Sequence, residues 1–181
     1  MPDSPAITAL LFGLRGCLIE ATSPQRPNAA PGALHTLDWL NQLQIPCAWI
    51  DELSSSDAEH LASPLPNWVK AQYRAQAPWP APDACWQALM ALQTHTLEGC
   101  VLISGEPRLL QSGLNAGLWT IGLATDGVSR ASDSPQEQEC KRARATLQLF
   151  ALGVHSVIDH LGALDDCLAD IGQRRLKGEK P

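Results

Sequence analysis

The chain has 181 residues, of which 45% are hydrophobic and 18% charged, and its formal net charge is −6. This composition argues against a disordered chain, and the length suits one well-buried domain but not two. The acidic balance disfavours nucleic acid as a partner, and no apolar run approaches the roughly 20 residues of a membrane helix. We therefore expect a single domain over residues 1–181, with no membrane partner, and in the cytoplasm because no export signal precedes it.

Short β-type runs alternate with helical patterns along the chain, which predicts an α/β fold on a mostly parallel sheet. The predicted strands are apolar and end near glycine, proline or polar residues; they are 6–12, 46–50, a weak strand at 68–71, 100–104, 119–123 and 155–158. The predicted helices repeat apolar residues every three or four positions; they are 34–43, a short helix from 56, 83–92, 108–116, 135–152 and a last helix through 161–171.

Two of these helices start with a capping signature, in which a serine precedes a glutamate by three residues. The pairs are Ser56 with Glu59 and Ser134 with Glu137. Apolar spacing then predicts the faces that two helices bury. The inner face of helix 135–152 is expected at Ala143, Leu147, Phe150 and Ala151, and that of the last helix at Leu161, Leu164, Leu168 and Ile171.

The cysteines and tryptophans are interpreted mainly as core residues. The six cysteines lie far apart with no C-x-x-C pair, which disfavours zinc or redox chemistry and suits reduced thiols in a cytosolic protein. Trp49 and Trp119 lie in predicted strands and are expected in the core. Trp68 and Trp79 flank proline-rich loops, where exposed rings would mark a partner site.

In a parallel α/β sheet, ligands bind outside the carboxyl ends of the strands, where the strand order reverses. The loops to inspect for function therefore start at Gly13, Asp51 and Ser104. This inference gives a place and names no reaction, because one fold can support many activities.

Several motifs in these regions resemble a known family. The run LLFGLRGCLIE (10–20) resembles the first motif of the haloacid dehalogenase superfamily, an apolar strand followed by D-x-D-G-T-x-x-D. The run SGLNAGLWTIGL (112–123) resembles a signature of its phosphonoacetaldehyde hydrolase branch, and segments 79–89 and 153–181 are similar to further parts of that branch. The resemblance covers nearly the whole chain and implies a three-layer α/β/α, Rossmann-like core.

Compared with that branch, the chain departs at the positions that carry the chemistry. The family's nucleophilic or metal-orienting aspartate corresponds to Gly13, and Arg15 stands two residues later where the family has aspartate or alanine. The hydroxyl residue of the second motif corresponds to Asp51, followed by Glu52, and a carboxylate there would repel a phosphate. The resemblance therefore implies that no covalent aspartyl intermediate forms at this site.

The remaining motifs are also incomplete. Trp79 stands where the family has a basic residue, and in the run 104–107 only Glu106 could serve as an acidic ligand of magnesium. The family's cap carries the lysine that forms a Schiff base, whereas the loop 21–31 at that place contains no lysine. We therefore expect no cap domain, no stable metal site and no cofactor.

These departures predict a non-catalytic binding or regulatory protein that contacts a partner protein or a small metabolite through the old active-site face. Four carboxylates are expected near the strand ends, namely Glu20, Asp51, Glu52 and Glu106, and the alternative is a hydrolase with a site rebuilt from Glu20, Asp51 and Glu106. Oligomerisation is a further possibility. Arg15 is expected to pair with Asp51 or Glu106 rather than to bind an anion, and Cys17 lacks the base that a reactive thiol needs.

Overall fold

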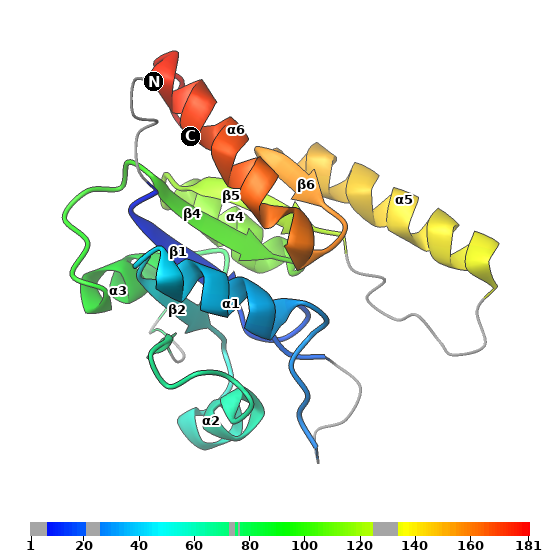
Figure 1. Ribbon diagram of the computed structural model, residues 1–181, viewed down its shortest axis with the longest axis horizontal. Helices are drawn as coiled ribbons and strands as arrows, with labels where there is room; N and C mark the ends of the chain where they lie inside the picture. The colour runs from blue at the N-terminus through cyan, green and yellow to red at the C-terminus, as the bar shows by residue number, and fades with distance from the viewer. Residues whose placement is uncertain (1–6, 21–25, 73–74, 76, 125–133) are drawn as a thin grey trace.

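The structure is a computed structural model that describes residues 7–20, 26–72, 75, 77–124 and 134–181 (Figure 1). Its strands form one sheet in the order β3-β2-β1-β4-β5-β6, and every neighbouring pair is parallel. The strands are β1 (Ala9–Gly13), β2 (Cys47–Ile50), β3 (Lys70–Gln72), β4 (Cys100–Ser104), β5 (Trp119–Leu123) and β6 (Ser156–Ile158). The order reverses between β1 and β4, so the sheet is doubly wound.

Helices cover both faces of this sheet and make three layers (Figure 1). They are α1 (Ala33–Gln42), α2 (Ser55–Ala62), α3 (Asp83–Ala91), α4 (Pro107–Asn115), α5 (Pro135–Leu152) and α6 (Leu164–Leu176), with a 3₁₀ turn η1 (Leu161–Ala163) before α6. Helices α1 and α6 pack on one face. Helices α3, α4 and α5 pack on the other. The predicted three-layer α/β/α fold with a parallel sheet is confirmed.

Strand β1 shows why the two faces need helices. Its residues alternate between two apolar clusters: Leu10 and Phe12 join the cluster with α1 and α6, and Ala9 and Leu11 join the cluster with α3 and α4. Every residue of β1 is buried, as expected for a parallel strand that helices cover on both sides. The apolar run in the sequence thus reflects burial on two faces.

Most predicted elements exist, with shifted ends. Strands β4 and β5 have the predicted bounds, while the weak strand starts at Lys70 instead of residue 68 and the first strand starts at Ala9. The cap of α2 was predicted wrongly: Ser54, two residues before Ser56, accepts the backbone N–H of Asp57. The capping box of Ser134 and Glu137 on α5 is confirmed.

The predicted inner face of α5 is wrong. Leu149 is the buried residue of this helix, and partly buried Ala145 and Leu152 pack beside it. The four residues predicted to face inward are all exposed: Ala143, Leu147, Phe150 and Ala151. By contrast, the predicted stripe of the last helix is buried along its whole length, at Leu161, Leu164, Leu168 and Ile171.

Candidate functional site

A cavity of about 350 Å³ opens at the carboxyl ends of β1 and β4, where the strand order reverses. It is lined by the loop after β1, the end of β2, the start of α4 and Trp79. Five of the positions singled out in the sequence meet there: Gly13, Arg15, Asp51, Trp79 and Glu106. This is the place that the strand topology predicts for a ligand.

Gly13 ends β1 against a serine side chain of the neighbouring strand. A Cβ atom built at Gly13 would lie 2.6 Å from Ser104 Oγ and 3.3 Å from Leu109 Cδ2. Ser104 is fully buried, and its Oγ accepts a hydrogen bond from the Glu106 backbone N–H at 3.0 Å. The hydroxyl is thus held in the space that any side chain at position 13 would need.

Arg15 is paired with Asp51 by two parallel hydrogen bonds. Its Nε and Nη2 donate to Oδ2 and Oδ1 of Asp51 at 2.9 and 2.7 Å. Asp51 is 2% exposed, and its Oδ1 also accepts the Leu53 backbone N–H at 3.0 Å. The hydrogen bonds with Asp51 raise the pKa of Arg15 against the opposing effect of its burial, so the guanidinium stays charged. The predicted pairing is therefore present.

Trp79 is buried at the cavity, 7% exposed, so of the two alternatives left open by the sequence, core packing and an exposed ring, the structure has the first. Its backbone is held from two sides. The N–H donates to Glu52 Oε1 at 2.8 Å, and the carbonyl accepts from Arg108 Nη2 at 2.5 Å. Within the described chain, the indole Nε1 has no hydrogen-bond partner. Trp68, the other tryptophan considered for exposure, is partly buried against the core.

Sequence reasoning missed Arg108 at this site and identified Ser104 only as the start of a loop. Besides holding Trp79, Arg108 forms an ion pair with Glu52 at 3.3 Å, which links the start of α4 to the loop after β2. An arginine in the first turn of a helix gives no signal of such a contact, because its partners are distant in the sequence. The position of the Ser104 hydroxyl beside Gly13 is not predicted, although a polar residue that ends an apolar strand is a signal for it.

The carboxylates do not all converge. Glu106 lines the cavity and caps α4, because its Oε1 accepts the Arg108 N–H at 3.1 Å. Glu20 is not among the residues that line the cavity; its backbone N–H pairs with the Asn28 carbonyl. In the portion of the chain that the structure describes, no group of three or more histidine, cysteine, aspartate or glutamate residues is arranged to hold a metal ion.

Cys17 is fully buried beside this site. Burial raises the pKa of its thiol to about 12, despite a hydrogen bond with the Gly13 backbone. A thiol in this state is protonated at neutral pH and is a poor nucleophile. The structure thus agrees with leaving Cys17 out of the candidate catalytic groups.

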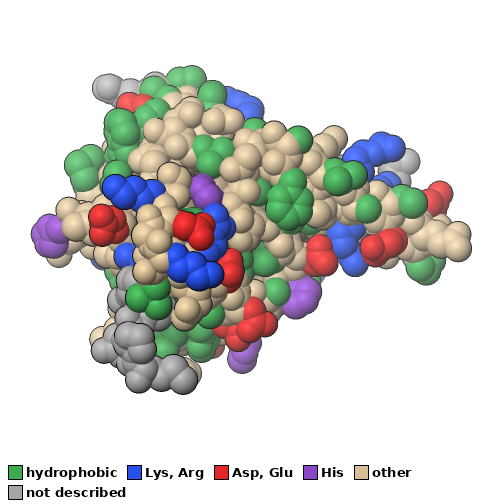
Figure 2. All heavy atoms as spheres, turned by 90° about the horizontal axis from the view of Figure 1, so that it is seen from above, with side chains coloured by type: hydrophobic (Ala, Val, Ile, Leu, Met, Phe, Trp, Pro, Cys, Tyr) green, Lys and Arg blue, Asp and Glu red, His purple; other side chains and the backbone are tan. Residues whose placement is uncertain are grey.

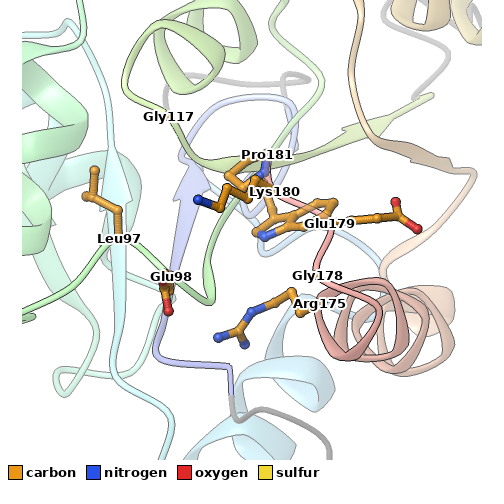
Figure 3. A pocket seen from close by; sticks show the side chains of 9 residues that line it. Leu97, Glu98, Gly117, Arg175, Gly178, Glu179, Lys180 and Pro181 are labelled. Atoms are coloured by element: carbon orange, nitrogen blue, oxygen red, sulfur yellow. The ribbon is translucent and has the colours of Figure 1, made fainter.

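A second cavity, of about 440 Å³, lies near the amino ends of the strands. It is lined by Trp119 at the start of β5, by the loop before β4 and by the C-terminal segment. Figure 3 shows the side chains of Arg175 and Lys180 extending toward Leu97 and Glu98. Because ligands of such sheets bind at the carboxyl ends of the strands, we take the cavity at Gly13 as the candidate site.

Comparisons with known proteins agree with this fold. The phosphonoacetaldehyde hydrolase of Salmonella enteritidis is 32% identical over 143 residues, which are 75% of this chain and 53% of that enzyme. A solved structure without a functional name is 54% identical, with a TM-score of 0.88 over 96% of this chain and 98% of the other. This chain belongs to the haloacid dehalogenase-like superfamily. It spans about half the length of the curated relatives it matches.

Two further superfamily structures share the fold. The phosphonoacetaldehyde hydrolase-like protein of Oleispira antarctica has a TM-score of 0.77 at 24% identity, over 87% of this chain and 62% of the other. A haloacid dehalogenase family hydrolase of Deinococcus radiodurans has a TM-score of 0.72 at 19% identity, over 94% and 98%. No family model matches the chain.

The superfamily resemblance at 112–123 has a structural explanation in this chain. Asn115 Nδ2 donates to the Pro80 carbonyl at 2.9 Å, and Ser112 Oγ donates to the Ala81 carbonyl, so α4 holds the loop that carries Trp79. Gly117 has a φ of +78° at the turn into β5, a conformation that favours glycine. A Cβ at Gly122 would lie 3.0 to 3.3 Å from atoms of Leu149. Residues of this signature therefore fix the position of the loop that carries Trp79, which lines the candidate site.

Among the described residues, no helix combines the length and the apolar content that crossing a bilayer requires.

Proposed function

We propose that this chain is a non-catalytic member of the superfamily that binds a small molecule in the cavity at Gly13. One observation carries the proposal: where the resemblance places the nucleophile, the chain has a glycine, and the Ser104 hydroxyl lies 2.6 Å from where a Cβ would be. Without a side chain at this position, no group is in place to attack a substrate or to orient a metal there. The proposal includes loss of the cap, because only residues 14–32 separate β1 from α1.

The carboxylates at the site do not fit a magnesium ion. Magnesium needs several oxygen ligands in octahedral geometry. Both oxygens of Asp51 accept hydrogen bonds from Arg15, and one also accepts from Leu53, while an oxygen of Glu106 caps α4. Asp51 is thus neutralised by Arg15 and Glu106 serves as a helix cap, so the two carboxylates that line the cavity do not make the ligand set of a magnesium ion, and no reaction step is derived through that metal.

The same groups indicate what chemistry the cavity accepts. The buried indole N–H of Trp79 has no partner in the described residues, and leaving a buried donor unpaired costs about 1–3 kcal/mol. Because Trp79 lines the cavity, we propose that a bound ligand places a hydrogen-bond acceptor against this N–H and so removes that cost. The residues that line the cavity include two carboxylates, Asp51 and Glu106, against one arginine, Arg15, and this negative balance disfavours a phosphate dianion. We therefore propose an uncharged small molecule with a carbonyl or hydroxyl oxygen. The cavity volume of about 350 Å³ is within the range of metabolite sites.

We also propose that the protein is located in the cytoplasm. Burial raises the pKa of the thiols of Cys47 and Cys85, to about 12 and about 11. Such thiols pack as small apolar side chains and suit a reducing compartment, which supports the cytoplasm.

A turnover assay tests the loss of catalysis. The purified protein is incubated with magnesium, phosphonoacetaldehyde and a panel of phosphate esters, and released phosphate is measured. We expect no release above that of heat-denatured protein. Turnover that Asp51→Ala or Glu106→Ala abolishes would refute the proposal and establish the rebuilt carboxylate hydrolase instead.

A thermal-shift screen tests the binding role. The probes are uncharged amides, aldehydes and polyols, with inorganic phosphate for comparison. We expect at least one uncharged compound to raise Tm. Trp79→Phe, which removes only the indole N–H and one ring, should weaken the affinity for that compound by about fivefold or more. Trp39→Phe on α1 is the matched control and should leave binding unchanged. Stabilisation by none of the probes, or stabilisation that Trp79→Phe does not affect, would contradict this role.

A further inference from the structure

Helix α5 presents an apolar stripe to solvent. Leu147 is 70% exposed and Phe150 is 54% exposed, although both side chains are large and apolar. Cys140, Ala143 and Ala151 lie on the same side of the helix and are also exposed. In Figure 1 the helix projects from the body, and Figure 2 shows apolar side chains along this projecting part with acidic and basic ones beside them.

The opposite side of α5 already packs on the chain's own body. Leu149 is 4% exposed there, and Ala145 and Leu152 are partly buried beside it. The exposed stripe is therefore a second apolar face on one helix. A helix that is apolar on both sides is usually covered on both sides.

The spacing of the stripe is that of a helix-pairing seam. Positions 140, 143, 147 and 150 alternate steps of three and four, which are the a and d positions of two heptads. In this register, Glu139 takes a g position and Arg144 takes the e position that follows it, five residues later. In a parallel pair of helices, a g residue of one chain faces the next e residue of the other.

The charges beside the seam therefore fit a second copy of this chain. In a parallel pair, Glu139 of each copy faces Arg144 of the other, so the two-fold axis produces two opposite-charge contacts. Within one chain, Glu139 pairs with Arg142 at 3.2 Å, and its side chain is 69% exposed. An exposed pair of this kind contributes little free energy, so it does not prevent Glu139 from contacting a second copy.

We infer that two copies of this chain associate through α5 as a short parallel helix pair. Leu147 meets its counterpart at the centre of the seam, flanked by layers of Phe150 and Ala143, and Cys140 meets its counterpart at the end. The seam has only two heptads, so the dimer is weak and forms with increasing concentration. This inference is independent of what the cavity at Gly13 binds.

Sedimentation velocity over a wide range of concentrations tests the association. We expect a monomer–dimer equilibrium in the wild type and a dissociation constant raised tenfold or more by Leu147→Glu. Leu43→Glu, a change of the same type at an exposed leucine after α1, is the matched control and should leave the equilibrium unchanged. A wild type that stays monomeric throughout, or a dimer that Leu147→Glu leaves intact, would overturn the inference.

Two measurements test the register of the α5 pair and the parallel direction of its two helices. Glu139→Arg should weaken the dimer by placing like charges together, and adding Arg144→Glu should restore it. A short bis-maleimide should link the two copies through Cys140 in the wild type and not in Cys140→Ser. A dimer that the charge exchange does not restore, or that yields no link through Cys140, would show that the pair is not parallel in this register.

Discussion

At position 13, the space beside the backbone limits what the end of β1 can carry. A Cβ there would meet Ser104 Oγ at 2.6 Å and the Ser104 Cβ at 3.3 Å. We expect Gly13→Ala to destabilise the protein by about 1–3 kcal/mol in the wild type, because the buried hydroxyl must move. The cost should be smaller in a Ser104→Ala background, where the contacts at 3.3 Å with Leu109 Cδ2 and with the Cβ of residue 104 remain but the 2.6 Å contact is gone. A double-mutant cycle measures the coupling between positions 13 and 104. The free energy of unfolding in urea is determined for the wild type, Gly13→Ala, Ser104→Ala and the double variant.

The cycle separates crowding from the other effects of each change. Ser104→Ala alone also removes the bond from the Glu106 backbone N–H, but this cost is common to both arms and cancels in the coupling. Coupling near zero would mean that the hydroxyl does not restrict position 13. The result bears on catalysis, because any carboxylate restored at this position needs the same space.

Only part of the candidate site could be predicted from the sequence at the scale of single residues. Arg15 and Asp51 each follow an apolar strand, and the ends of β1 and β2 are neighbours in a doubly wound sheet, so their pairing follows from position and opposite charge. The backbone of Trp79 is held by Glu52, from the loop after β2, and by Arg108, from the first turn of α4. No local pattern encodes contacts of that kind.

At the scale of elements, strands β4 and β5 could be predicted with their bounds, because apolar runs there are framed by glycine or polar residues. Helix α5 shows where such reasoning fails. Apolar residues occur on two of its sides, and periodicity cannot tell which side the body covers. The contact with β5 identifies the buried side: Leu149, which lies outside the predicted face, packs so close to Gly122 that a Cβ there would lie 3.0 to 3.3 Å from its atoms.

Two leucines of α5 allow a direct test of this assignment. Leu149→Ala should lower the free energy of unfolding by about 2–5 kcal/mol, because it opens a cavity between the helix and the sheet. Leu147→Ala removes the same atoms two residues earlier and should change it by less than about 0.5 kcal/mol in the dilute, monomeric protein. Urea unfolding followed by circular dichroism measures both. Equal losses for the two variants would contradict the assignment of the faces.

At the scale of the whole molecule, the C-terminal helix is tied to the edge of the sheet by one polar and aromatic group. The Arg174 guanidinium lies 4.8 Å from the ring centre of Trp119, and its Nη1 donates to the His155 carbonyl at 3.2 Å. The His155 ring lies 4.8 Å from that of Trp119. The group connects β5, the start of β6 and α6, so a change in the charge of His155 affects how the last third of the chain packs.

This group makes the stability of the whole fold depend on pH. The Thr120 backbone N–H donates to His155 Nδ1 at 3.0 Å, which requires a neutral ring, and burial together with the charge of Arg174 lowers the pKa of His155 below 6.5. Between the lowered pKa and the ordinary one, the unfolded chain binds more protons than the folded chain, so stability falls as the pH drops below about 6.5 and is retained above it. Urea unfolding at several pH values should show this loss in the wild type and a shallower one in His155→Gln, whereas His35→Gln, at an exposed position of α1, should keep the wild-type slope. Identical slopes for His155→Gln and the wild type would show that the ring does not couple folding to pH.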